Sequence, residues 1–348
     1  MLITRDFRIH FQIYFIPGIH CSTKSIVGDI QTALNLGDTS ANYTREECVW
    51  RPYNDFNLCP DPDINFFFYS ESNPTHGERV NMTQGDFLRI HHWDPMKQNV
   101  ILIHGYAGGN DIIPGVILRD AYLQNGSYNV FVVDWGQLAR IPCYVAAVHN
   151  LRTVAQCTAH LFNFIRNTGI SSKAITCVGH SLGAHICGLI SNYLLFRIHR
   201  IIALDPARPL IRNSVRLKPG MAESVQVIHT NAGNYGESGK IGKIDFCLNG
   251  GKIQPLCENK TRADLCSHAL SICYLAESID VSNALKATPC SRRCPTGPRP
   301  SHRIGLPVLL GEHTPESATG SYCATMKQAP YCSKTNPKGH PWCCLEES

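Results

Sequence analysis

The pentapeptide Gly179-His180-Ser181-Leu182-Gly183 is the strongest chemical signal in the chain. It follows the short apolar run Ala174 to Val178 and precedes residues whose apolar positions fit a buried helix. A Gly-X-Ser-X-Gly between a strand and a helix forms a nucleophile elbow, in which the glycines make room for neighbouring backbone and the helix start aims N–H groups at an oxyanion. The pattern predicts that Ser181 is a nucleophile.

An acid and a histidine must accompany such a serine. The hydroxyl is a weak nucleophile until a histidine takes its proton, and the acid fixes the tautomer of that histidine. In this arrangement the acid follows the serine along the chain and the histidine comes last. Asp205 ends the apolar run Ile201 to Leu204, and Pro206 ends the ladder there, so we expect Asp205 to be the acid rather than only a turn cap.

The histidine has to be chosen among those that follow Asp205. Spacing does not distinguish the candidates, which are His229, His268, His302, His313 and His340. His268 follows Cys266 and precedes the helix-like run Ala269 to Ala276, so a disulfide at Cys266 would anchor its loop. His229 lies within an apolar strand, where a structural core histidine is the simpler interpretation. Local context favours His268.

Preformed hydrogen-bond donors are needed for a tetrahedral intermediate. The N–H of Leu182 is one expected donor. The second is expected in the loop after the apolar run 99–104, where Gly105 lets the backbone come close and Tyr106 offers its N–H. The alternative for this loop is a tight turn with no role in chemistry.

The elements that must position these residues alternate between strand and helix. Short apolar runs that end in turn chemistry predict strands at 65–70, 99–104, 128–135, 174–178, 200–204 and 224–230. Apolar residues at helical spacing predict helices over 151–166 and 181–195. This order predicts a mostly parallel central sheet with helices on both faces and a ligand site beyond the carboxyl ends of the strands.

Composition and charge exclude several classes of protein. The 348 residues are 43% hydrophobic and 17% charged, as in a folded globular chain. The net charge of +5 is too small to indicate nucleic-acid binding. No P-loop or GxGxxG follows a strand, and no pair of C-x-x-C units has finger spacing, so no cofactor and no metal are expected.

Seventeen cysteines indicate disulfides and an oxidising compartment. Because the number is odd, at least one thiol is unpaired, and Cys177 and Cys187, in apolar contexts on either side of Ser181, are candidates for buried free thiols. Four candidate glycosylation sequons, which fit a secreted protein, occur at Asn42, Asn81, Asn125 and Asn259. We expect a secreted, extracellular protein.

The chain divides into three predicted parts. Residues 1–22 carry basic positions before an apolar run and predict a signal peptide, with an atypical N-terminus as the alternative because Pro17 interrupts the run. Residues 23–60 are polar, lack a sustained period and lead into the core. Residues 61–348 predict a single domain with a Cys-rich C-terminal tail, and no later stretch is apolar enough to span a bilayer.

Seven motifs resemble the pancreatic-lipase family in content and order, over about residues 60–330. They are ILIHGY, VVDWG, VGHSLGAH, ALDPARP, VIHTN, DFCLNGG and CSHALSICYLAES. The resemblance implies an α/β-hydrolase fold and a carboxylic ester hydrolase that acts on lipids through Ser181, Asp205 and His268. It also implies a Cys59–Cys143 disulfide.

Two short loops refine the expected substrate. The loop from Cys257 to Cys266 resembles the lid disulfide of the family but encloses only eight residues, of which four are charged. The loop from Asn231 to Ile244 is also short and Gly-rich. An open, polar mouth would admit a bulky headgroup, so the chain looks similar to the insect phospholipase A1 branch, which implies cleavage of the sn-1 ester of glycerophospholipids.

Two alternatives remain for the function. One is a triacylglycerol lipase with the same triad, and the other is a catalytically silent lipid-binding or yolk-type protein. The resemblance leaves no room for the C-terminal β-sandwich of the pancreatic enzymes, so no colipase is expected. The expected partner is a lipid or membrane surface, and the sequence does not indicate an oligomeric state.

Overall fold

The computed structural model describes residues 48–52, 59–290, 293–296 and 305–345. The predicted signal peptide, most of the segment that leads into the core, Asn42 and His302 lie outside the described residues. In the described part of the chain, no helix is both long and apolar enough to cross a membrane.

One eleven-stranded sheet, counted over the described residues, organises the molecule in the order β10-β9-β11-β8-β7-β6-β5-β3-β4-β1-β2. Six neighbouring strands at its centre run parallel. They are β3 Gln98–Ile103, β4 Tyr128–Asp134, β5 Ile175–His180, β6 Ile198–Leu204, β7 Ala222–His229 and β8 Ile244–Leu248. They are buried almost throughout, as their continuous apolar runs predict for strands covered on both faces.

Shorter strands extend the sheet at both edges. On one side β1 Asn65–Ser70 pairs antiparallel with β4, and β2 Asn73–Arg79 pairs antiparallel with β1. On the other side β11 Gly320–Ala324 runs parallel to β8, followed by the antiparallel strands β9 Lys286–Pro289 and β10 Val308–Leu309. The outermost strand β2 is polar and largely exposed, which suits an edge.

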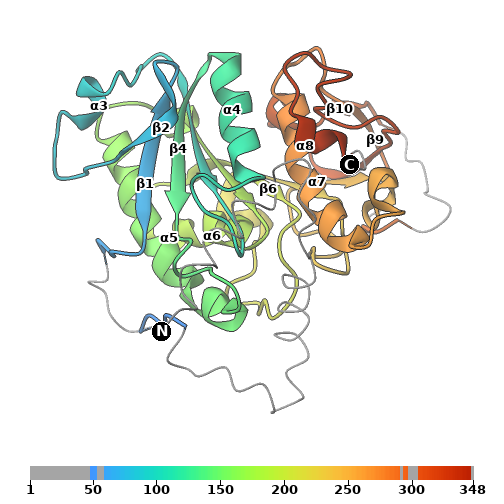
Figure 1. The fold of residues 1–348 in the computed structure, drawn as a ribbon, viewed down its shortest axis with the longest axis horizontal. Helices are drawn as coiled ribbons and strands as arrows, with labels where there is room; N and C mark the ends of the chain where they lie inside the picture. Colours follow the sequence, from blue (N-terminus) through green and yellow to red (C-terminus); the bar gives the residue numbers. More distant parts are fainter. Residues whose placement is uncertain (1–47, 53–58, 291–292, 297–304, 346–348) are drawn as a thin grey trace, which may run out of the picture.

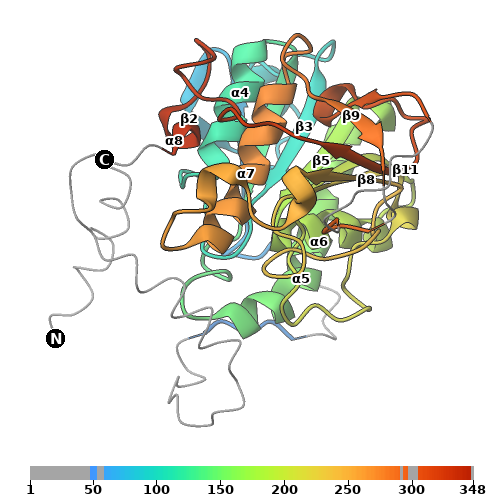
Figure 2. The ribbon, with the colours of Figure 1, turned by 90° about the vertical axis from the view of Figure 1, so that its right-hand side faces the viewer.

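Helices cover both faces of the sheet. Figure 2 shows α4 Gly115–Asn125 above the sheet and α5 Tyr144–Arg166 with α6 Leu182–Leu189 below it. Because successive strand residues point to opposite faces, Ile101 packs with the α5 and α6 side, whereas Leu102 packs with α4 and with α7 Ala263–Ser278. Figure 1 shows the same layers and the short helices α3 Phe87–Ile90 and α8 Pro341–Cys344.

Single turns of 3-10 helix complete the connections. Their bounds are η1 Ser172–Ala174, η2 Ile190–Tyr193, η3 Pro219–Met221, η4 Asn249–Gly251, η5 Pro255–Cys257 and η6 Gly311–His313. The helix predicted over 181–195 is shorter than expected, since α6 ends at Leu189 and continues as η2. The predicted architecture, a mostly parallel sheet between two helical layers, is confirmed.

Eight disulfides join sixteen cysteines, and the seventeenth, Cys21, lies outside the described residues. The expectation of free thiols beside Ser181 is wrong, because Cys177 on β5 is bonded to Cys187 on α6. The elbow folds the helix back onto its own strand, so these residues have Cα atoms only 5.9 Å apart.

The disulfide implied between residues 59 and 143 is also wrong. Cys143 pairs with Cys48, and Cys59 pairs with Cys157, about four helical turns further along α5. Both disulfides join the segment before β1 to α5 or its N-cap. The spacing of the cysteines along the sequence therefore did not show whether Cys59 pairs with Cys143 or with Cys157. Their Cα separations of 5.5 and 5.2 Å are typical of disulfides.

Candidate active site

Ser181 occupies a strained turn between β5 and α6. Its backbone has φ 57° and ψ −118°, a conformation that residues other than glycine rarely adopt. A Cβ at Gly179 would lie 2.3 Å from the carbonyl oxygen of Gly183, and a Cβ at Gly183 would lie 2.1 Å from that of Ile103. Both glycines are therefore required by the close packing of the turn, as the pentapeptide predicts.

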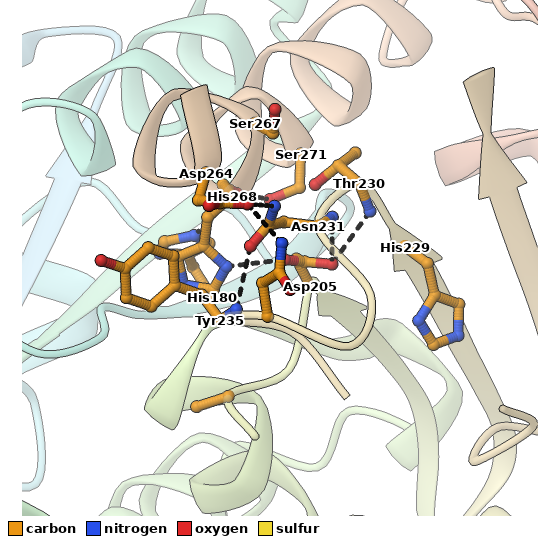
Figure 3. Close-up of polar contacts among 12 residues, drawn as sticks. His180, Asp205, His229, Thr230, Asn231, Tyr235, Asp264, Ser267, His268 and Ser271 are labelled. Atoms are coloured by element: carbon orange, nitrogen blue, oxygen red, sulfur yellow. Dashed lines mark hydrogen bonds and ion pairs between the residues drawn. The ribbon is translucent and has the colours of Figure 1, made fainter. Parts of the chain in front are cut away.

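Asp205 lies at the end of β6 and holds the histidine that the sequence favours. Its Oδ2 accepts a hydrogen bond from Nδ1 of His268 at 2.6 Å, and its Oδ1 accepts the N–H groups of Thr230 and Asn231 at 2.9 and 3.0 Å (Figure 3). The carboxyl is 0% exposed, so these donors replace the water it has lost. A Cβ at Gly236 would lie 2.5 Å from the carboxyl oxygens, so a glycine is needed to leave them room.

The ring of His268 is close to two other aromatic side chains. Ring centroids are 4.6 Å apart for His180 and His268 and 5.7 Å apart for Tyr235 and His268 (Figure 3). Burial, together with the nearby His268, lowers the pKa of His180 well below its usual value. A neutral His180 at neutral pH adds no positive charge beside His268.

A polar network ties the Asp205 loop to the helix that carries His268. Asp264, one turn before His268 on α7, accepts hydrogen bonds from the side-chain amides of Asn231, at 2.9 Å, and of Asn234. Oδ1 of Asn231 accepts the N–H of Tyr235 at 2.9 Å. Sequence analysis missed these residues, and the only signal for them was the VIHTN motif, in which Asn231 lies two residues after the end of β7.

Disulfides hold α7 on both sides of His268. Cys266 is bonded to Cys257 across the short lid loop, and Cys273 is bonded to Cys343 of the C-terminal α8. His268 thus sits on a helix that is cross-linked two residues before it and five residues after it.

The loop after β3 passes directly against the serine. A Cβ at Gly105 would lie 2.7 Å from Cβ of Ser181. The neighbouring His104 fixes this loop, because its Nε2 accepts the N–H of Trp135 at 3.1 Å and its backbone oxygen accepts the indole N–H of Trp135 at 3.0 Å. Tyr106, next in this loop, lines the same cavity as Ser181.

Leu182 is the first residue of α6, and the N–H groups of a first helical turn have no acceptor within the helix. Leu182 and Tyr106 therefore lie on the two segments that meet at Ser181. Their assignment as oxyanion donors remains a prediction.

The other candidate histidines lie elsewhere. In the described residues, His229 on β7 is fully buried and bonds Asp245 at 3.0 Å, as a structural core histidine does. His313 bonds the carbonyl oxygen of Ile279, and His340 accepts the N–H of Trp342 at the start of α8.

His185 connects α6 to the chain after Asp205. One ring nitrogen donates to the carbonyl oxygen of Ala207 at 2.6 Å, and the other accepts the N–H of Leu217 at 3.0 Å. Burial lowers the pKa of His185 to about 4. Sequence analysis assigned no role to this residue, although it lies in the VGHSLGAH motif.

Stability should fall in mild acid because of His185. Below pH 6.5 His185 is protonated in the unfolded chain, but in the folded chain it stays neutral down to about pH 4. Folding therefore becomes less favourable between these pH values. In urea unfolding, His185 should lower the free energy of unfolding by about 1.4 kcal/mol for each pH unit in this range. The slope should be shallower by that amount in His185→Asn and unchanged in His92→Asn, whose side chain is exposed. Equal slopes in all three proteins would contradict this assignment.

A cavity of about 470 Å³ connects these residues. Ser181, His268 and Tyr106 line it where the strands end. Many of its lining residues are apolar and come mainly from the sheet, α4, α7 and the C-terminal segment, namely Leu102, Val132, Val178, Leu118, Ile113, Ala269, Ile272, Trp342 and Leu345. The lid loop contributes the cationic residues Lys260 and Arg262. The lining therefore combines many apolar side chains with two cationic ones.

The fold and this site define an α/β-hydrolase. The sequence pattern of the lipase family, described simply as "Lipase", matches residues 36–294, and the chain belongs to this family.

Relatives of the chain include several named lipases. The chain is 31% identical to pancreatic lipase-related protein 2 of Sus scrofa, over 70% of this chain and 57% of that protein. It is 30% identical to lipase member H-A of Xenopus laevis, over 65% of this chain and 51% of that protein. It is 29% identical to pancreatic triacylglycerol lipase of Oryctolagus cuniculus, over 67% of this chain and 58% of that protein. The chain spans just over half the length of these relatives.

Proposed function

We propose that this protein is a hydrolase of lipid carboxylic esters. In the proposed reaction, Oγ of Ser181 attacks the ester carbonyl while His268 takes its proton, and Asp205 stabilises the imidazolium that forms. His268 then protonates the leaving alcohol, and water hydrolyses the acyl-enzyme with His268 again as the base. The N–H groups of Leu182 and Tyr106 would stabilise the oxyanion. The 2.6 Å bond between His268 and the buried Asp205, beside a shared cavity with Ser181, supports these roles.

We further propose phospholipase A1 activity, which cleaves the sn-1 ester of a glycerophospholipid. The observation that carries this proposal is the lid. The disulfide between Cys257 and Cys266 closes a loop of eight residues, and two of them, Lys260 and Arg262, line the cavity together with Leu265. Cationic side chains favour a phosphate group, whereas a triacylglycerol presents no charge to them. The apolar wall suits the acyl chain.

A triacylglycerol lipase is the second candidate, and it is favoured by the relationship to pancreatic triacylglycerol lipase of the rabbit. Purified protein should be assayed on 1-palmitoyl-2-oleoyl phosphatidylglycerol and on trioctanoin, with products identified by mass spectrometry. We expect palmitate and 2-oleoyl lysophospholipid. Strong trioctanoin turnover without any lysophospholipid would contradict the phospholipase A1 proposal and support the second candidate.

A matched pair of variants sharpens this assay. Lys260→Gln should lower kcat/KM on the anionic phospholipid and leave trioctanoin turnover unchanged, because only the phospholipid offers the lysine a charge. Lys286→Gln, on the exposed side of β9, is the control and should change neither rate. An equal loss on both substrates for Lys260→Gln would argue against headgroup recognition.

We also propose that the protein is secreted. Eight disulfides within the described residues suit an oxidising compartment. The described sequons are all exposed, at Asn81, Asn125 and Asn259. The same proposal takes residues 1–22 as a signal peptide, 23–60 as an N-terminal segment and 61–348 as one lipase domain.

A further inference from the structure

Residues 331–345, here called the tail, pack against the two helices that flank the cavity. The N–H of Tyr331 donates to Glu277 on α7 at 2.7 Å, and its hydroxyl donates to Gln124 on α4 at 3.3 Å. Figures 1 and 2 both show α8 beside these helices. The tail thus bridges α4 and α7.

Two disulfides fix the tail in this position. Cys343 on α8 is bonded to Cys273 on α7, and Cys344 is bonded to Cys332, so the tail is closed on itself as well as fastened to the helix of His268. The buried Cys343 belongs to the same core as α4 and α7. Sequence analysis assigned no role to this segment.

The tail contributes two large apolar side chains to the cavity. Trp342 and Leu345 line it together with Ile272, which precedes the bonded Cys273 on α7. Ile272 lies four residues beyond His268, which is about 6 Å further along the helix axis. The tail therefore joins the lining of the cavity beside a part of α7 that is displaced from His268, where the remote part of an acyl chain would lie in the proposed reaction.

We propose that Trp342, with Leu345 beside it, determines which acyl chains the enzyme accepts, by setting the depth of the apolar pocket. This inference rests on the proposed ester hydrolysis. Indole is the largest side chain available to block a pocket. The backbone that carries Trp342 is held by its N–H bond to His340 and by the disulfides of Cys343 and Cys344. An acyl chain that reaches past Trp342 therefore meets a large side chain on a cross-linked backbone.

The test is hydrolysis of p-nitrophenyl esters from butyrate to palmitate by the full protein. Trp342→Ala should raise the ratio of kcat/KM for palmitate over octanoate by at least about tenfold, because one methylene in an apolar pocket already changes kcat/KM by about that factor. Trp342→Phe should stay near the wild-type ratio. Trp50→Ala is the matched control, since Trp50 is partly exposed and does not line the cavity.

A second measurement does not depend on turnover. Binding of 12-bromododecanoic acid should quench the tryptophan fluorescence of the wild type and of Trp50→Phe, and most of this quenching should be lost in Trp342→Phe. An unchanged chain-length profile in a folded Trp342→Ala, or undiminished quenching in Trp342→Phe, would overturn the inference. If the wild type hydrolysed no ester at all, the proposed function would fail, whereas normal hydrolysis with an unchanged profile would count against the tail alone.

Discussion

Replacing Ser181 with alanine should lower kcat by at least about 10³-fold, the scale of loss when a triad member is removed. The substitution deletes the hydroxyl that would attack the ester, and it changes little else, because only a small side chain in the elbow is shortened. The rate should be measured on a phospholipid and on a soluble p-nitrophenyl ester. The wild type should also react with a fluorophosphonate probe at one serine, and Ser181→Ala should not.

Ser72→Ala is the matched control, because Ser72 is exposed in the turn between β1 and β2. It should keep the wild-type rate and the probe label. Unchanged esterase activity in Ser181→Ala, or a wild type that the probe does not label, would exclude the proposed mechanism and favour the catalytically silent lipid-binding alternative.

Asp205→Asn should lower kcat by about 10³- to 10⁴-fold while leaving the fold intact. Oδ1 of Asp205 accepts two backbone N–H groups, from Thr230 and Asn231. An asparagine must keep its oxygen there, so its amide would face Nδ1 of His268 and donate to it. Nε2 would then carry the proton and could not accept one from Ser181.

The rate loss should therefore appear in kcat on every ester, with a thermal midpoint close to that of the wild type. The double variant Ser181→Ala, Asp205→Asn should be no slower than Ser181→Ala, because residues that act as one unit do not contribute additively. If kcat of the double variant fell by the product of the two single losses, a shared mechanism would be contradicted. Asp264→Asn, which keeps an oxygen facing Asn231, is the comparison for a change that alters only the support of α7.

Most central strands and the order of the candidate residues were predictable because both are local signals. Five of the six central parallel strands coincide with predicted apolar runs, and β1 has the predicted bounds, Asn65–Ser70. The sixth, β8, was missed because its five residues include the buried Asp245. Asp205 was selected as the candidate acid because Pro206 marks the end of its strand. His268 needed more context, since spacing left five histidines open and only the nearby Cys266 and the helix-like run after His268 favoured one of them.

The missed elements lack such signals. β2 is polar and has no buried residue, so no apolar alternation indicates a strand. β9 and β10 have four and two residues, too short for any period. Helix α4 begins directly after Pro114 and has apolar residues on most of its surface, because it packs against the sheet, α7 and the tail.

Contacts between distant segments were the least predictable. Disulfide partners are chosen by position in the fold, and neither Cys48–Cys143 nor Cys273–Cys343 follows from spacing. The same holds for Trp342, which reaches the cavity only because the tail crosses two helices.

The cross-links on α7 also bear on how the protein has to be made. Cys266 and Cys273 flank His268 and reach to Cys257 and to Cys343, 70 residues later in the chain. The helix that carries His268 is therefore cross-linked on both sides only after Cys343 has been synthesised and the paired cysteines have been oxidised. In the reducing cytoplasm of a bacterium the chain would be synthesised, but these disulfides would not form. Recombinant protein should therefore be produced in the periplasm or the endoplasmic reticulum, with a disulfide isomerase present.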